Sequence, residues 1–129
     1  MRWSEFEGSP NRRKDERARV TLNKRGILML NKQAFEAFGG PQAVKLLFEE
    51  HELVIGLKPE DIRRKNAFPV KLKDRKYNSH LIHLMPFIKH YKIRIERTVL
   101  FNDIDIDNQN VMRLPLRKTI AIGNRWEKD

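Results

Sequence analysis

The chain has 129 residues, 27 of them Lys or Arg against 17 Asp or Glu, and it contains no cysteine. This length suits one compact domain or two small halves that share a core, and the lack of cysteine excludes disulfides, thiolate catalysis and cysteine-ligated zinc. No apolar run approaches a membrane span and the N-terminus lacks the apolar segment of a secretory signal, so we expect a cytoplasmic protein without membrane contacts.

The charge balance favours a polyanionic partner. The formal net charge is +10 and the pI is about 10.2, values that point first to nucleic acid. The positive charge is also concentrated, because residues 58–76 hold eight basic residues against three acidic ones. The alternative interpretation is a basic surface without a nucleic-acid partner.

Residues 1–18 lack hydrophobic periodicity. Their apolar anchors are Trp3 and Phe6, and a basic run begins at Arg12. The composition is typical of a flexible basic arm that becomes ordered on a partner. The alternative is a disordered tail whose Trp3 packs onto the domain.

Residues 19–59 begin with a β-hairpin and a short helix. Apolar runs at Val20–Leu22 and Ile27–Leu30 flank a turn that ends in Gly26, and glycine accepts the positive φ that a tight hairpin requires. Asn31 is a suitable N-cap for a helix with Ala34, Phe35 and Phe38 at helical spacing. The following Gly-Gly-Pro sequence ends that helix.

Alternating residues then predict a strand over 44–48, an acidic turn and a return strand over 53–57. The resulting order, β-turn-β, short α, β-turn-β, resembles the swapped-hairpin domain of AbrB/MazE-type bacterial transcription regulators and antitoxins. The residues in register with that family's pattern are Val20, Thr21, Leu22, Gly26, Lys32, Ala37, Phe38, Gly39, Val44, Val54, Leu57 and Pro59. The sequence departs from the pattern at Asn31, where the family has proline, and at Phe35, where it has an arginine in the helix.

The rest of the chain predicts a divergent second copy. Residues 60–66 read as a basic linker, 67–117 as the second repeat and 118–129 as a C-terminal tail. The expected elements are a strand over 68–72, a basic turn, a return strand over 80–84, a helix over 85–91 opened by proline, a strand over 93–101 extended by Ile104 and Ile106, a turn over 107–110 and a strand over 111–116.

A duplication is physically reasonable, because a single unit of this size does not bury its own apolar faces. The arrangement resembles the MraZ regulators, which carry two copies in one chain. We therefore expect a mostly β, small α+β fold with short helices, built as a pseudo-twofold barrel from two β-turn-β-α-β-turn-β repeats. The resemblance implies a monomeric pseudo-dimer or a homodimer.

The sequence does not predict an enzyme, a cofactor or a metal site. Asp103, Asp105 and Asp107 resemble the start of a calcium loop, but that loop needs glycine at its sixth position and glutamate at its twelfth, where this chain has Asn108 and Leu114. His80 and His83 lie three apart on an expected strand and therefore face opposite sides.

Basic residues at the tips of two expected hairpins remain as the candidate site. Lys24 and Arg25 lie at the first tip, and Lys73, Arg75 and Lys76 lie at the second. With the two halves related by a pseudo-twofold axis, we expect both tips to project from the same side and to contact double-stranded DNA, as the first hairpins do in AbrB-like proteins. The predicted DNA-binding residues are Arg19, Lys24, Arg25, Lys32, Lys71, Lys73, Arg75 and Lys76.

The expected function is that of a sequence-specific or general DNA-binding regulatory protein, associated with the bacterial nucleoid. Two alternatives stay open. One is an antitoxin-like protein whose charged ends, 12–17 or 117–129, bind a protein partner, and the other is a structural interaction module that has lost DNA binding. The replacement of the family's arginine by Phe35 keeps the latter open.

Overall fold

The computed structural model describes residues 2–5 and 17–122. The predicted basic arm falls largely outside these residues, as does most of the predicted tail. The helices are α1 (Lys32–Ala37) and α2 (Met85–His90). The strands are β1 (Val20–Leu22), β2 (Ile27–Leu30), β3 (Ala43–Glu49), β4 (Val54–Pro59), β5 (Phe68–Pro69), β6 (Lys71–Asp74), β7 (Ser79–His83), β8 (Val99–Phe101), β9 (Asp105–Ile106), β10 (Met112–Pro115) and β11 (Thr119–Ala121).

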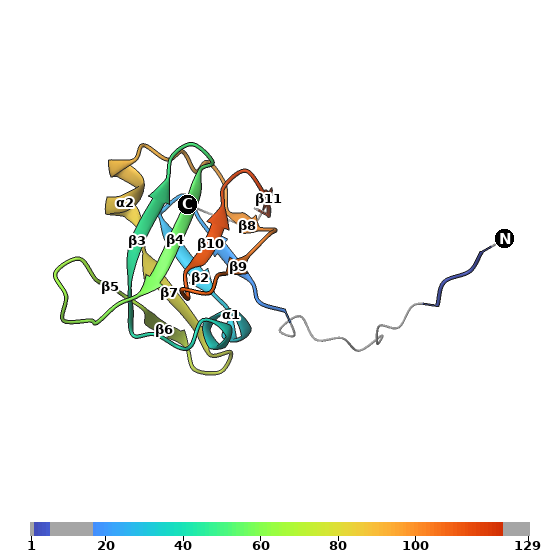
Figure 1. Ribbon diagram of the computed structural model, residues 1–129, viewed down its shortest axis with the longest axis horizontal. Coiled ribbons are helices and arrows are strands. Elements are labelled where there is room, and N and C mark those ends of the chain that lie inside the picture. The colour runs from blue at the N-terminus through green and yellow to red at the C-terminus, as the bar shows by residue number, and fades with distance from the viewer. Residues whose placement is uncertain (1, 6–16, 123–129) are drawn as a thin grey trace.

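The strands form two antiparallel sheets, which lie one behind the other in Figure 1. The six-stranded sheet has the order β11-β8-β1-β2-β7-β6, and the five-stranded sheet has the order β5-β3-β4-β10-β9. The mostly β, small α+β class is therefore confirmed, whereas the sheets do not close into the expected barrel. Among the described residues, no helix is long and apolar enough to cross a membrane.

The hydrophobic core lies between the two sheets. The inward-facing residues of the first hairpin, Val20, Leu22, Leu28 and Leu30, are almost completely buried, and Phe38 at the end of α1 joins them. Each sheet contains strands from both predicted halves of the chain, because β2 pairs with β7 in one and β4 pairs with β10 in the other. The two halves therefore share a single core.

Local turn chemistry explains the first hairpin. The side-chain oxygen of Asn23 accepts hydrogen bonds from the backbone N–H groups of Arg25 and Ile27, both at 3.0 Å. Gly26 has a φ of +79°, and a Cβ at this position would lie 3.0 Å from the Cα of Met85. Glycine is therefore required both by the turn and by the close approach of α2.

The predicted first helix is also confirmed. Asn31 caps α1 by accepting a hydrogen bond from the backbone N–H of Ala34 at 2.9 Å, and it accepts a second one from the N–H of Arg19 at 2.9 Å. This cap ties the start of the helix to the start of β1. Gly39 and Gly40, with φ values of +91° and +61°, take the chain out of the helix.

The predicted strand over 93–101 is largely wrong, since only Val99–Phe101 pairs as a strand. Lys92 adopts a left-handed conformation with φ +53°, and the N–H of Ile93 bonds back to the carbonyl of Ile88 at 3.0 Å. Ile93 and Ile95 then pack on the core from an irregular segment. Their alternation reflects burial of one face without strand pairing.

Three further boundaries differ from expectation. The predicted strand over 68–72 breaks at Val70, whose N–H bonds to the carbonyl of Gln42 at 2.9 Å, so that β5 joins one sheet and β6 the other. The extension through Ile104 and Ile106 is wrong, because β9 lies in the sheet opposite β8. The predicted tail contains β11, which pairs with β8.

Candidate nucleic-acid interface

The register of β2 and β7 separates the two predicted hairpin tips. These strands are antiparallel, with Ile27 opposite His83 and Leu30 opposite His80. The β1–β2 turn comes just before Ile27, and the β6–β7 turn comes just before β7, so the turns lie at opposite ends of this strand pair. The expectation that both tips project from the same side is therefore wrong.

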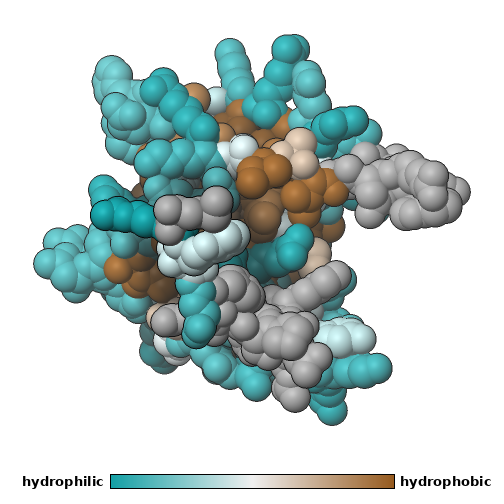
Figure 2. All heavy atoms as spheres, turned by 90° about the vertical axis from the view of Figure 1, so that its right-hand side faces the viewer, coloured by the Kyte–Doolittle hydropathy of each residue, from teal (hydrophilic) through white to brown (hydrophobic). Residues whose placement is uncertain are grey.

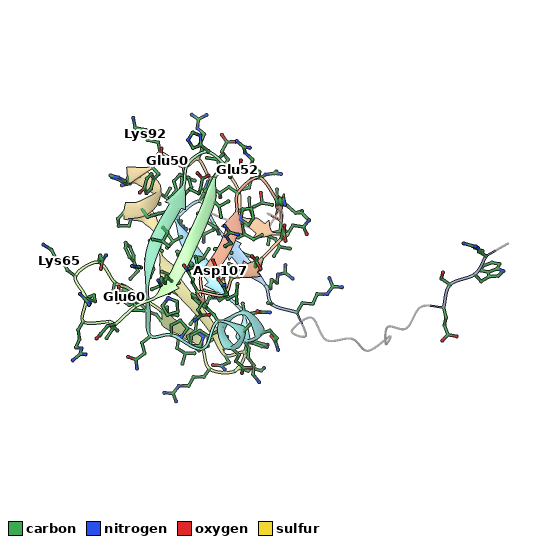
Figure 3. All side chains as sticks on the ribbon, in the orientation of Figure 1. Glu50, Glu52, Glu60, Lys65, Lys92 and Asp107 are labelled. Carbon is green, nitrogen blue, oxygen red and sulfur yellow. The ribbon has the colours of Figure 1, made fainter. Side chains whose placement is uncertain are left out.

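Lys24 and Arg25 lie at the α2 end of the molecule. The carbonyl of Gly26 in their turn accepts a hydrogen bond of 2.7 Å from the N–H of Leu84, which directly precedes α2. The acidic β3–β4 turn lies at the same end, because Phe48 near the end of β3 contacts Phe87 of α2. Glu50 and Glu52 of this turn lie at the top of Figure 3.

The other six predicted DNA-binding residues lie near α1, in β6 or in the turn after β6. Arg19, directly before β1, is hydrogen-bonded to Asn31, and both residues line a shallow groove with Ser79 of β7. β6 is the neighbour of β7 in the six-stranded sheet, so β6 and the β6–β7 turn lie beside β7. The predicted residues found here are Arg19, Lys32, Lys71, Lys73, Arg75 and Lys76.

Additional basic residues precede β5 in the segment 60–67. Lys65 projects from this segment, away from the sheets, in Figure 3. β5 and β6 are the outermost strands of their sheets, and the chain passes from one to the other through Val70. We call this part of the molecule the basic edge and define it by residues 60–78. Its basic side chains are Arg63, Arg64, Lys65, Lys71, Lys73, Arg75 and Lys76.

The acidic residues on the basic edge are fewer and already engaged. Asp61 forms an ion pair of 2.7 Å with Arg63, and this hydrogen bond holds the pKa of the Asp61 carboxyl below its usual value. Asp74 accepts a hydrogen bond of 2.8 Å from the N–H of Lys76. Glu60 remains at the start of the segment, and its carboxylate accepts a bond from the N–H of Asp61.

The basic edge also exposes apolar and aromatic side chains. Ile62, Leu72 and Tyr77 are 49%, 47% and 65% exposed. Tyr77 lies in the β6–β7 turn, and the Nζ atom of Lys76 is 5.4 Å from the centre of its ring. Tyr77 is not among the residues predicted from the sequence, although an aromatic residue inside a basic turn is a signal that could have identified it.

At the opposite edge, formed by β9 and β11, two basic side chains lie near carboxylates. Lys118 pairs with Asp103 at 3.1 Å, and Arg113 lies 4.0 Å from Asp105. Asp107 accepts hydrogen bonds from the N–H groups of two residues in its turn, and the N–H of Val111 contributes most to lowering the pKa of its carboxyl. The three aspartates that resemble the start of a calcium loop thus each have a partner within the protein.

A groove of about 520 Å³ lies on this opposite side, lined by residues that include Leu100, Phe101, Ile104 and Arg19. Figure 2 faces this side and shows hydrophobic residues gathered between hydrophilic ones. The two edges therefore differ in kind, since one is basic and the other combines an apolar hollow with paired charges.

The two histidines of β7 face opposite sides, as expected. His80 is 8% exposed and its ring stacks on Phe35 of α1, with the ring centres 3.6 Å apart and the planes inclined by 8°. Burial lowers the pKa of His80. His83 is exposed. Phe35 thus joins α1 to the six-stranded sheet. In the described part of the chain, no three His, Asp or Glu side chains form a metal-binding group.

Comparison of the chain with protein-family models, curated proteins and solved structures finds no match.

Proposed function

We propose that this chain is a DNA-binding regulatory protein whose interface is the basic edge. The observation that carries the proposal is the excess of exposed Lys and Arg over carboxylates along 60–78, in contrast to the paired charges at the opposite edge. A local excess of cations attracts a polyanion and holds it by releasing the counterions condensed on its phosphates.

The proposed interface combines flexible side chains with a fixed frame. Arg64 and Lys65 belong to the exposed segment before β5, Lys71 and Lys73 to β6, and Arg75 to the turn after it. Long Lys and Arg side chains reach successive phosphates, while the paired strands keep their backbones in register. The positive charge alone does not distinguish double-stranded from single-stranded nucleic acid.

The AbrB/MazE-like and MraZ-like relationship is part of the proposal. It is supported by the order β1-β2-α1 near the N-terminus and the repeated order β6-β7-α2 later in the chain. The antiparallel pairing of β2 with β7 is what a pseudo-twofold axis between two copies requires. Under this proposal the β6–β7 turn retains the DNA-binding role, and Lys24 and Arg25 in the β1–β2 turn contribute less.

The proposal is tested by removing charge from the exposed segment. The variant Arg64→Ala/Lys65→Ala should weaken DNA binding and flatten the dependence of log K on log salt concentration, by up to about 0.9 for each duplex phosphate that is no longer neutralised. Fluorescence anisotropy of labelled DNA at several salt concentrations measures both quantities.

The matched control is Lys89→Ala/Arg94→Ala, which removes the same charge from two exposed residues in and just after α2. Equal weakening by both variants would show that net charge, and no particular surface, controls binding. Failure of the wild-type protein to bind any DNA at low salt would contradict the proposed function and favour a protein partner.

A further inference from the structure

We propose that the basic edge binds single-stranded nucleic acid, with Tyr77 as a platform on which an unpaired base stacks. This inference rests on the proposed function and specifies the form of its ligand. It starts from Tyr77, which is 65% exposed and lies directly after Arg75 and Lys76 in the β6–β7 turn.

The turn holds this aromatic ring outside the core. The carboxylate of Asp74 accepts a hydrogen bond from the N–H of Lys76 at 2.8 Å, and Asn78 adopts a left-handed conformation with φ +53°. The pairing of β6 with β7 shifts register between Leu72 and Asp74. These features fix a tight, irregular turn, in which Tyr77 is displayed at the tip while His80, in β7, is buried.

The neighbours of Tyr77 suit a nucleotide. An aromatic ring supplies a face for a base, and stacking of this kind tolerates any base sequence. The adjacent Arg75 and Lys76 are exposed cations that suit the phosphates on either side of that base. The ammonium of Lys76 lies over one face of the Tyr77 ring, 5.4 Å from its centre, so the base would stack on the opposite face.

This arrangement discriminates between strand forms. In a duplex the faces of the bases are covered by their neighbours, so an exposed tyrosine gains a stacking partner only where bases are unpaired. Leu72, 47% exposed on β6, adds apolar surface on the same edge. The β1–β2 tip differs, because it carries Lys24 and Arg25 without an aromatic residue and its Gly26 packs against α2.

The experiment compares three ligands of equal length, a single-stranded oligo-dT, a single-stranded oligo-U and a mixed-sequence DNA duplex. Wild type, Tyr77→Ala and Tyr77→Phe are each titrated at one salt concentration. We expect wild type to prefer the single strands, and Tyr77→Ala to weaken single-strand binding on the order of 5- to 100-fold with little effect on the duplex. Tyr77→Phe keeps the ring face and should bind like the wild type.

The thermal unfolding midpoint of Tyr77→Ala should match that of the wild type, because the side chain is exposed. A preference between oligo-dT and oligo-U would reflect the 2′-hydroxyl of the sugar or the C5-methyl group of the base, and either preference supports the proposal. Equal single-strand affinities for wild type and Tyr77→Ala, or tighter binding of the duplex by wild type, would overturn it while leaving DNA binding by the basic edge intact. Absence of binding to all three ligands would overturn both.

Discussion

Phe38 links the end of α1 to the core. Its side chain is 1% exposed, and its carbonyl accepts a hydrogen bond of 3.4 Å from the side-chain amide of Asn110, in the turn before β10. The helical spacing of Ala34, Phe35 and Phe38 predicts the burial of this residue. It does not predict the contact with Asn110, which lies 72 residues away in the sequence.

We expect Phe38→Ala to lower the free energy of unfolding by about 3–5 kcal/mol, because a fully buried aromatic side chain would leave a cavity between the sheets. Urea denaturation measures this change. A loss of less than about 1 kcal/mol would contradict the burial of Phe38 and the orientation of α1.

His80 makes the stability of the α1–β7 contact depend on pH. Burial lowers its pKa in the folded protein, so the unfolded chain binds the proton more readily as the pH falls through the ordinary histidine value of 6.5. Stability from this source is therefore present above that pH and is lost below it. Groups near the histidine include Phe35, stacked on its ring, and Leu30 and Leu72, paired with it across the sheet.

We expect the unfolding free energy, measured in urea from about pH 8 to about pH 5, to decrease toward low pH in the wild type and to decrease less in His80→Gln. The control is His83→Gln, on the exposed face of the same strand, which should retain the wild-type dependence. An unchanged pH dependence in His80→Gln would show that this histidine is not the source.

The helices and strands in the first half of the chain follow more directly from the sequence than those in the second half. Its boundaries depend on local chemistry, such as the turn around Asn23 and the cap at Asn31, and local chemistry is visible in the sequence. Strand partners are not local. The alternation of Ile93 and Ile95 identifies a buried face but not whether another strand pairs there, and Val70 gives no sign that the chain changes sheets.

The same limit applies to the candidate site. The sequence identifies the basic stretch from 58 to 76. It does not show at which end of the molecule each hairpin tip lies, because that depends on the register of β2 and β7. Part of the charge on β6 has a structural explanation, since Lys71 and Lys73 protect an edge strand from pairing with another chain. That explanation does not extend to Arg64 and Lys65, which precede the strands, or to Arg75 in the turn.

The two edges of the paired sheets carry different charges. The edge with β9 and β11 balances Lys118 and Arg113 with aspartates, whereas residues 60–78 on the other edge keep a positive excess. Such a separation directs a polyanion to one side of the protein and orients it before contact. The net charge of +10 adds attraction from every direction but no orientation.

The two hairpin tips provide the most direct test of the basic edge as the interface. Arg75→Ala/Lys76→Ala and Lys24→Ala/Arg25→Ala each remove two exposed cations, at opposite ends of the β2–β7 pair. The measurement is the slope of log K against log salt concentration, on whichever form of DNA the wild type binds more tightly. We predict that Arg75→Ala/Lys76→Ala flattens the slope by nearly 2 on a duplex, or about 1.4 on a single strand, and that Lys24→Ala/Arg25→Ala changes it by less than about 0.5. Equal flattening by the two variants, or a larger effect of Lys24→Ala/Arg25→Ala, would contradict the assignment of the interface to the basic edge.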